Sequence, residues 1–522
     1  MKNISSLFTK NNYLLICISI SGIILLFFPK WIVDDSFILF RYAENFVTKG
    51  ELNWNIGENP VEGYTGVLSV LLLSIGYLLK LNPILISHTI GVTSLIFSIV
   101  LIYFIQLKIN INQKIAFIIT LMFSTAPAIY THVFSGLETI LFIFLILAVV
   151  YFGLTLFEKK NNNIIYFIVL LLLSLVRPEG LFFSVLSFCI LLIYFYKYKK
   201  PSLVTYSKNS FFIYFLPFSL YLTYKTIYYG AIFPNTYYIK SATNQFNISS
   251  YFSLIYFFKY YFFIPVTICV ILLISTYLFV YKNKSEIIYD VKVRFTAVLI
   301  IIFSLILIGK YLFTSLLMNY SYRFYIPIFP IVLILIGYII NKLFGNFTRL
   351  FVNKAYYYIV SAAIFALILI QINIIYFQFR KEVLYTAKHI LLIENVHKKV
   401  GCFLRKNFSA SKILVHADAG AIPYYSKLQT IDFGGLNDEY LARTNNLTKQ
   451  NIIDYFFNVN ADILIITSFN SKEIKRIAGS LNWDTLQLII KDKRFNNYEL
   501  IKTFGTETWN YFEFVYKKKA IH

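Results

Sequence analysis

The chain has 522 residues, of which 58% are hydrophobic, 19% aromatic and only 14% charged. Apolar residues this abundant, arranged in long runs, exclude a soluble multidomain protein and predict a polytopic membrane protein. The formal net charge of +23 would suggest nucleic acid as a partner, but many of the basic residues fall in short loops between apolar runs, where they set orientation, so we expect a lipid bilayer and no nucleic acid.

Eleven apolar runs are interpreted as transmembrane helices. The first follows Lys2 and Lys10, as a signal peptide would, but no small-residue cleavage site comes after it, so we expect an uncleaved helix. The run at 164–176 barely crosses a hydrocarbon core at about 1.5 Å per residue. The expected spans are 13–33, 83–107, 115–130, 137–157, 164–176, 181–196, 211–228, 260–281, 295–317, 324–340 and 356–377.

The segment 64–79 is apolar enough to span, and its placement decides the sidedness of everything after it. If it does not span, the basic loops around Lys108, Lys159 and Lys197 fall on the side of the N-terminus, as the positive-inside rule requires. We therefore interpret it as an interfacial or re-entrant helix. The N-terminus is then cytoplasmic, and the chain from residue 380 lies outside a bacterial cytoplasmic (inner) membrane.

Beyond residue 380 the hydropathy falls, and short apolar runs alternate with polar helical patterns. The runs at 412–416, 461–467 and 511–516 are typical of buried strands. The predicted fold is thus an all-α polytopic membrane domain, residues 1–379, followed by a small extracytoplasmic α/β domain, residues 380–522.

Two adjacent carboxylates, Asp34 and Asp35, follow the first span. A charge at a bilayer centre costs roughly 2.5 to 3.5 kcal/mol, so a pair held at a membrane edge indicates chemistry on a partly lipidic substrate. For glycosyl transfer, a base must take the proton of an acceptor hydroxyl, and Asp34 is the candidate. Asp35 would orient it, bind the acceptor or hold a divalent cation; the alternative for Asp35 is a helix N-cap.

A departing lipid phosphate needs fixed cations, and the arginine fork grips two phosphate oxygens. The predicted topology places Arg41, Arg177 and Arg323 at the outer face, with Lys310 near the outer headgroups. We predict that these four residues bind the donor phosphate. Simple snorkelling is the alternative for Lys310.

The same topology gathers further polar residues on the outer face. Glu138 has an alternative role as a charge at a helix start, and Glu179 as a partner of Arg177. The candidate substrate-binding residues are Glu44, Glu62, Tyr64, Glu138, Glu179, Asn235 and Asp418.

Cofactor motifs are missing from the sequence. His88, His132 and His416 lack the spacing of metal ligands, and no dinucleotide or nucleoside-triphosphate motif occurs. The missing nucleotide loop disfavours a nucleotide-sugar or ATP-driven enzyme. The sequence thus indicates no certain cofactor, and a divalent cation at Asp35 stays open.

With these residues in view, the chain resembles the GT-C superfamily of polyprenyl-phosphate-sugar glycosyltransferases, in particular the cell-wall arabinofuranosyltransferases. The resemblance implies that Asp34 is the catalytic base and that outer-face cations meet the lipid phosphate. The matching pieces are Asp34-Asp35-Ser-Phe, Phe40-Arg41-Tyr42, Glu62-Gly-Tyr64-Thr, Ser135-Gly-Leu-Glu138-Thr, Arg177-Pro-Glu179-Gly, Pro234-Asn235-Thr-Tyr, Arg323-Phe and Asp418-Ala-Gly.

The function expected from the sequence is transfer of a sugar, for example arabinofuranose, from a polyprenyl-phosphate donor. The acceptor would be a glycan, a glycolipid or a protein outside the membrane. Two alternatives stay open: a flippase or transporter of lipid-linked sugars, which should have polar residues in the middle of several spans, and an O-antigen ligase or polymerase.

The sidedness can be tested by fusing a reporter after Lys159. We expect the reporter to be cytoplasmic, because the basic loops share the side of the N-terminus. A matched fusion after residue 380 should be extracytoplasmic. Finding the Lys159 fusion outside the cytoplasm would reverse the assignment of segment 64–79.

Overall fold

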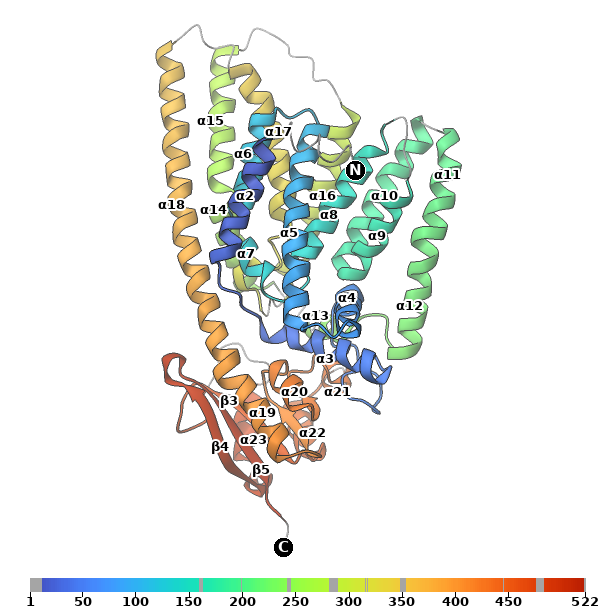
Figure 1. Ribbon diagram of the computed structural model, residues 1–522, viewed down its shortest axis with the longest axis vertical. Coiled ribbons are helices and arrows are strands. Elements are labelled where there is room, and N and C mark those ends of the chain that lie inside the picture. Colours follow the sequence, from blue (N-terminus) through green and yellow to red (C-terminus); the bar gives the residue numbers. More distant parts are fainter. Residues whose placement is uncertain are drawn as a thin grey trace.

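The protein is a helical bundle that carries a sheet-containing domain at one end (Figure 1). In the bundle the long helices run side by side, and the sheet domain lies beyond α3, close to the C-terminus. The computed structural model describes residues 12–158, 163–198, 200–241, 246–280, 290–314, 316, 318–347, 354–444, 446–475 and 483–520.

Every predicted span contains helix in its described part. Large apolar side chains such as Leu26, Leu305 and Phe365 lie exposed on the outside of these helices, as a lipid environment permits. The helices are α2 (Asn12–Phe27), α5 (Pro83–Lys108), α6 (Gln113–Ser124), α7 (Pro127–Val133), α8 (Thr139–Thr155), α9 (Ile164–Val176), α10 (Pro178–Tyr198), α11 (Lys200–Ser210), η1 (Phe211–Phe215), α12 (Leu216–Tyr229), α14 (Ile248–Tyr261), α15 (Phe263–Val280), α16 (Val291–Leu312), α17 (Ile328–Phe347) and α18 (Lys354–Leu392).

By length and composition, four helices within the described residues can cross a membrane, or six if each bent pair forms one span. One bend, of 56°, separates α6 from α7 at Pro127, and the other, of 60°, separates α14 from α15. Pro127 starts α7 because its fixed φ suits the first helical turn. The count of eleven spans stays a prediction.

The segment predicted to be interfacial forms α4 (Val67–Leu78), which has 12 residues. At 1.5 Å per residue it is about 18 Å long, too short to cross a hydrocarbon core of about 30 Å. It packs against α3 (Asp34–Lys49) near the sheet domain (Figure 1). The helix α13 (Asn235–Ser241) lies at the same end.

The end domain contains a five-stranded mixed sheet in the order β2-β1-β3-β5-β4. β1 (Lys412–Val415) pairs in parallel with β2 (Gln429–Asp432) and β3 (Ile463–Ser468). β5 (Tyr511–Lys518) runs antiparallel to β3 and to β4 (Tyr498–Thr506). The three predicted strands are confirmed as β1, β3 and β5, whereas β2 and β4 were not predicted.

Helices cover both faces of this sheet. Ile413, Ile465 and Val515 pack on one face with α19 (Lys398–Asn407) and α20 (Ala421–Ser426). Leu414 and Leu464 alternate to the other face, against α22 (Lys449–Asn458) and α23 (Trp483–Lys491). The period of two along each strand thus supplies two apolar cores, which explains why the strands are apolar without interruption.

Arg41 joins α3 to the sheet domain. Its side chain is buried, and its guanidinium donates to the carbonyl oxygens of Trp54 (2.9 Å), Pro423 (2.9 Å) and Leu428 (2.8 Å) and to Asn55 Oδ1 (3.0 Å). The guanidinium of Arg41 therefore donates to protein acceptors. The sequence had instead predicted that Arg41 binds the donor phosphate.

The long helix α18 connects the two parts of the chain. It runs from Lys354 to Leu392 and is followed directly by η4 (Ile393–His397) and α19. Thirty-nine residues extend for about 58 Å, well beyond a hydrocarbon core. The predicted domain boundary at residue 380 falls inside this continuous helix.

Replacing Arg41 by Met should loosen the sheet domain from α3. The substitution leaves buried acceptors without donors, each costing roughly 1 to 3 kcal/mol. We expect a lower unfolding temperature in detergent and faster proteolysis between α18 and β1. Arg405→Met is the control, since Arg405 lies exposed on α19. Equal effects of the two substitutions would contradict the docking role.

Candidate active site

Three cations gather at a cavity at the end of the bundle that carries the sheet domain. Arg177 lies between α9 and α10, Lys310 in the last turn of α16, and Arg323 directly after η2 (Tyr320–Tyr322). All three line this cavity, together with Thr65, Glu179, Thr236, Tyr237, Tyr311 and Phe324. Segments far apart in the sequence thus bring their cations to one place.

Carboxylates separate these cations. Glu179 Oε1 accepts hydrogen bonds from Lys310 Nζ (2.8 Å) and Tyr311 Oη (3.0 Å), and Glu179 Oε2 lies 3.7 Å from Arg177 Nε. Glu138 Oε1 lies 3.5 Å from Arg177 Nε and 3.3 Å from Arg323 Nη2. Each of the three cations therefore has at least one carboxylate neighbour.

Both arginines have N–H groups that donate no hydrogen bond within the described structure. Within the described structure, Arg177 Nε and Nη1 and Arg323 Nε are buried without a hydrogen-bond partner. Phe324 packs against both guanidiniums, with their carbon atoms 5.6 Å from its ring centre. Buried unpaired N–H groups are costly, so this arrangement suits an anionic ligand that accepts from them.

Glu138 is held ionised by the arginines. Burial alone would raise the pKa of Glu138, but the Arg323 and Arg177 guanidiniums outweigh burial and hold its pKa below the ordinary value. Asp35 also faces this cluster, because its Oδ2 lies 3.9 Å from Arg323 Nη1. Asp35 is therefore the member of the acidic pair that approaches the phosphate-binding candidates.

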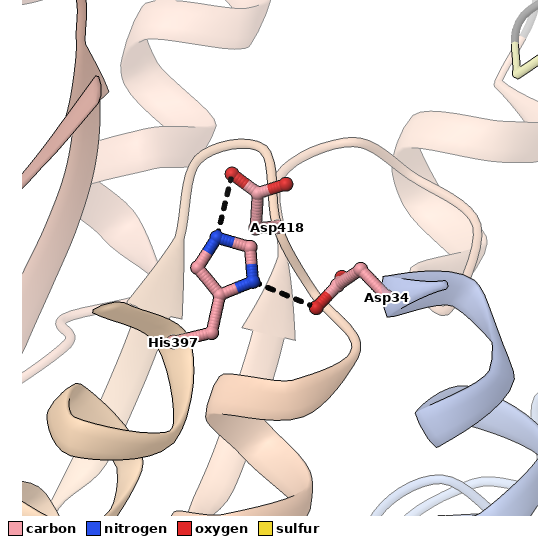
Figure 2. A group of neighbouring side chains, drawn as sticks. All are labelled: Asp34, His397 and Asp418. Carbon is pink, nitrogen blue, oxygen red and sulfur yellow. Dashed lines mark hydrogen bonds and ion pairs between the residues drawn. The ribbon is translucent and has the colours of Figure 1, made fainter. Parts of the chain in front are cut away.

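Asp34 turns to the sheet domain. Its Oδ2 accepts from Gly420 N (2.8 Å), and its Oδ1 accepts from Ala421 N (2.8 Å) at the start of α20. His397 Nδ1 lies 3.1 Å from the same Oδ1 (Figure 2). Burial alone would raise the pKa of Asp34, but His397 and the two amides outweigh burial and lower it. Neither Asp34 nor Asp35 lines the cavity formed by Arg177, Lys310 and Arg323, and Asp35 approaches that cluster through Arg323.

A second group of polar side chains surrounds His397. Figure 2 shows the imidazole between Asp34 and Asp418, with Nε2 3.8 Å from Asp418 Oδ2. Thr467 Oγ1 lies 3.4 Å from Asp418 Oδ2 and 3.1 Å from Glu513 Oε1. Burial and nearby carboxylates raise the pKa of Asp418 and raise that of Glu513 well above its ordinary value.

Glu62, Tyr64 and Asn235 support the loop between α3 and α4 beside the cavity. Glu62 Oε2 lies 2.9 Å from Lys225 Nζ, and burial raises the pKa of Glu62 to about 7 despite this lysine. Tyr64 Oη lies 3.0 Å from Tyr229 Oη. Asn235 N donates to Glu62 O (3.0 Å) and thereby fixes the start of α13, whose Thr236 and Tyr237 line the cavity.

The structure thus brings together Asp35, Glu138, Arg177, Glu179, Lys310 and Arg323 among the predicted site residues. It places Asp34 and Asp418 in the neighbouring group around His397. It keeps Arg41 and Glu44 apart from both groups, since Glu44 forms an ion pair with Lys427 at the surface.

Sequence reasoning missed His397, Tyr311 and Glu513. His397 lies at the end of a long helical pattern, and Glu513 alternates within an apolar strand. A glutamate facing inward from a buried strand was a usable signal, because an uncompensated buried charge is rare.

Comparisons with known proteins bear on both parts of the chain. Residues 387–516 match a family described as a domain of unknown function (DUF8728). No curated protein matches the sequence.

Solved structures resemble the whole chain. ArnT from Cupriavidus metallidurans in the apo state is 11% identical with a TM-score of 0.57, over 98% of each chain. ArnT bound to undecaprenyl phosphate is 10% identical with a TM-score of 0.52, over 96% of this chain and 97% of the other. The chain has the GT-C fold.

An archaeal protein shares this GT-C fold. The oligosaccharyltransferase AglB from Archaeoglobus fulgidus, in complex with an inhibitory peptide and a dolichol-phosphate, is 11% identical with a TM-score of 0.53. The match covers 96% of this chain and 73% of AglB. At these identities the likeness extends to the fold, and the site must be argued from its own residues.

Gly420 is needed for the close approach of Asp34. A Cβ at Gly420 would lie 2.0 Å from Asp34 O and 2.5 Å from Asp34 Oδ2. Gly420→Ala should therefore separate α3 from α20 and cost about 1 to 3 kcal/mol of folding free energy, as overpacking does. Thermal unfolding in detergent measures this. Gly22→Ala, with nothing within 4 Å, is the control, and equal stability of the two variants would contradict the contact.

Proposed function

We propose that the protein transfers a sugar from a polyprenyl-phosphate donor to a cell-envelope acceptor at the outer face of a bacterial cytoplasmic membrane. The observation that carries this proposal is the cavity lined by Arg177, Lys310 and Arg323 at the edge of an apolar bundle. A lipid chain would lie along the helices, and its phosphate would meet the cations. Both proteins that share the fold have solved structures with a lipid phosphate: ArnT bound to undecaprenyl phosphate, and AglB in complex with an inhibitory peptide and a dolichol-phosphate.

The donor phosphate would bind to the arginines first. Arg177 and Arg323 present buried N–H groups without partners, which a phosphate oxygen can accept. Lys310 is the most exposed of the three cations, at 32% of its side chain, and lies at the rim. Negative charge that develops on the leaving phosphate is stabilised by groups already in place, so little reorganisation is needed during the reaction.

The base is proposed to be Asp35, in place of Asp34. Asp35 faces Arg323, and its side chain is 27% exposed. The carboxylate of Asp34 is 11% exposed and accepts from Gly420, Ala421 and His397, which lowers its basicity. Geometry decides before pKa, because a base must reach the acceptor hydroxyl beside the departing phosphate. Asp34 then positions its neighbour.

A flippase is disfavoured by the location of the charges. A transporter carries its polar site near the bilayer midplane, often at interrupted helices. Here the charged cluster lies at the end of the bundle beside the sheet domain. The choice of sugar, with arabinofuranose as one candidate, and the choice of acceptor rest on the sequence resemblance.

The test compares Asp35→Asn with Asp34→Asn in the purified chain, supplied with a polyprenyl-phosphate sugar and an acceptor glycan. We expect Asp35→Asn to reduce release of polyprenyl phosphate at least 100-fold while donor binding persists, because general base catalysis contributes about 10²- to 10⁴-fold. Asp34→Asn should lower stability together with activity.

The matched readouts separate the outcomes. Loss of turnover in Asp34→Asn at unchanged stability, with an active Asp35→Asn, would return the base to Asp34. Absence of polyprenyl phosphate release by the unmodified chain with every monosaccharide donor would refute the transferase proposal. Movement of a labelled lipid-linked sugar from one leaflet of a vesicle membrane to the other, without release of polyprenyl phosphate, would favour the flippase.

A further inference from the structure

A second cavity lies beside α18, where the apolar part of that helix ends. Residues 355–379 contain no charged side chain, and Arg380, Lys381 and Glu382 follow them directly. Charged and tyrosine side chains at such a point lie at the level of lipid headgroups. The cavity has a volume of about 240 Å³, and none of its lining residues lines the cavity of Arg177. Its polar lining consists of Tyr260, Tyr261, Tyr322, Gln378, Lys381 and Glu382.

Glu382 is a buried carboxylate with one oxygen left to accept. Its Oε2 accepts hydrogen bonds from Thr131 Oγ1 (2.8 Å) and from Ser321 Oγ. Among the described residues, Oε1 accepts no hydrogen bond, and Glu382 forms no ion pair with a lysine, arginine or histidine. A buried carboxylate is stable only when it is paired, so Oε1 is an acceptor for a cationic group that enters the cavity.

Three tyrosine rings form the wall of the cavity next to this carboxylate. The rings of Tyr261 and Tyr322 meet at 82° with their centres 6.0 Å apart, and that of Tyr260 lies 6.4 Å from Tyr322. Ser321 and Tyr322 have φ angles of 47° and 59°, which side chains other than glycine rarely adopt, so the surrounding structure must hold them there. Aromatic faces attract ammonium groups. The rings and Glu382 therefore suit the same ammonium ligand.

Two hydrogen-bond donors stand beside the acid on α18. Gln378 lies three positions before Lys381 and four before Glu382, so the three residues share one face of the helix. Lys381 is exposed, and Gln378 Nε2 is buried without a hydrogen-bond partner in the described structure. Both are donors that phosphate oxygens accept. The cavity thus offers an acceptor for an ammonium group and donors for a phosphate at neighbouring positions.

We propose that this cavity binds the zwitterionic headgroup of a phosphatidylethanolamine lipid. The ammonium group donates to Glu382 Oε1 and lies against the tyrosine rings, while the phosphate accepts from Lys381 and Gln378. The acyl chains run along the apolar surface of α18, where the side chains of Ile370 and Phe377 are exposed.

The chemistry of the site predicts which headgroup it selects. A choline headgroup has no N–H group to donate to Glu382, and a glycerol headgroup has no cation. Phosphatidylethanolamine should therefore bind more tightly than phosphatidylcholine or phosphatidylglycerol. The inference does not rest on the proposed function, because lipid retention is measured without turnover.

The experiment incubates the full-length chain in detergent with an equimolar mixture of the three phospholipids, all with the same acyl chains, and measures the retained lipid by native mass spectrometry. We expect selective retention of phosphatidylethanolamine. Glu382→Gln should weaken this retention about tenfold or more, because hydrogen bonds to charged groups are the strong ones. The glutamine can still accept from Thr131 and Ser321. Glu394→Gln is the control, since Glu394 is exposed, pairs with Lys398 and lies outside the cavity.

A second variant keeps the test valid if Glu382→Gln fails to fold. Lys381→Gln changes an exposed side chain and should also weaken retention of phosphatidylethanolamine, because it removes the cation next to the phosphate. Equal retention of the three lipids by the unmodified chain would overturn the proposal, since the cavity would then hold lipid without selection. Retention that neither Glu382→Gln nor Lys381→Gln weakens would overturn it as well, and would place the bound lipid elsewhere on the bundle.

Discussion

The divergence of two neighbouring carboxylates at the start of α3 is the constraint on which the site depends. Successive residues of a helix point about 100° apart, so Asp34 and Asp35 leave α3 in different directions. Asp34 binds the amides of Gly420 and Ala421 in the sheet domain, whereas Asp35 faces Arg323 in the bundle. One helical turn thereby aligns the two parts of the chain, and a change in either contact would displace the other.

The cation cluster illustrates how a buried site can be stable before its ligand arrives. Arg177, Lys310 and Arg323 stand against Asp35, Glu138 and Glu179, so the described pairs balance in formal charge. The unpaired N–H groups of Arg177 and Arg323 are the part of the cost that remains among the described residues. A phosphate would relieve that cost, and so the same feature that weakens the empty protein strengthens ligand binding.

Much of this arrangement could be predicted from the sequence, and the limits are physical. Hydropathy located the helices, and short apolar runs located β1, β3 and β5, because both signals are local. The basic loops placed Arg177, Lys310 and Arg323 at one end. β2 was missed because three of its four residues, Gln429, Thr430 and Asp432, are polar, so it contains no apolar run.

The hydrogen-bond and ion-pair partners of the polar side chains could not be predicted from the sequence. Arg41 has the chemistry of a phosphate ligand, but its guanidinium donates hydrogen bonds to the carbonyl oxygens of Pro423 and Leu428 instead. These two residues are more than 380 positions away in the sequence. Asp34 and Asp35 look equivalent along the chain, and only the tertiary contacts distinguish them. Residue type indicates which chemistry a side chain can perform. The fold determines which side chains already contact other protein groups and which ones can still contact a ligand.

The continuity of α18 with η4 and α19 has a mechanical consequence. One rod of 50 residues, Tyr358–Asn407, extends from the lipid to the imidazole of His397. Helices tilt when bilayer thickness departs from their apolar length. A thinner or thicker bilayer would therefore change the tilt of this helix and displace its far end. Membrane composition would in this way alter the position of His397 and of the sheet domain.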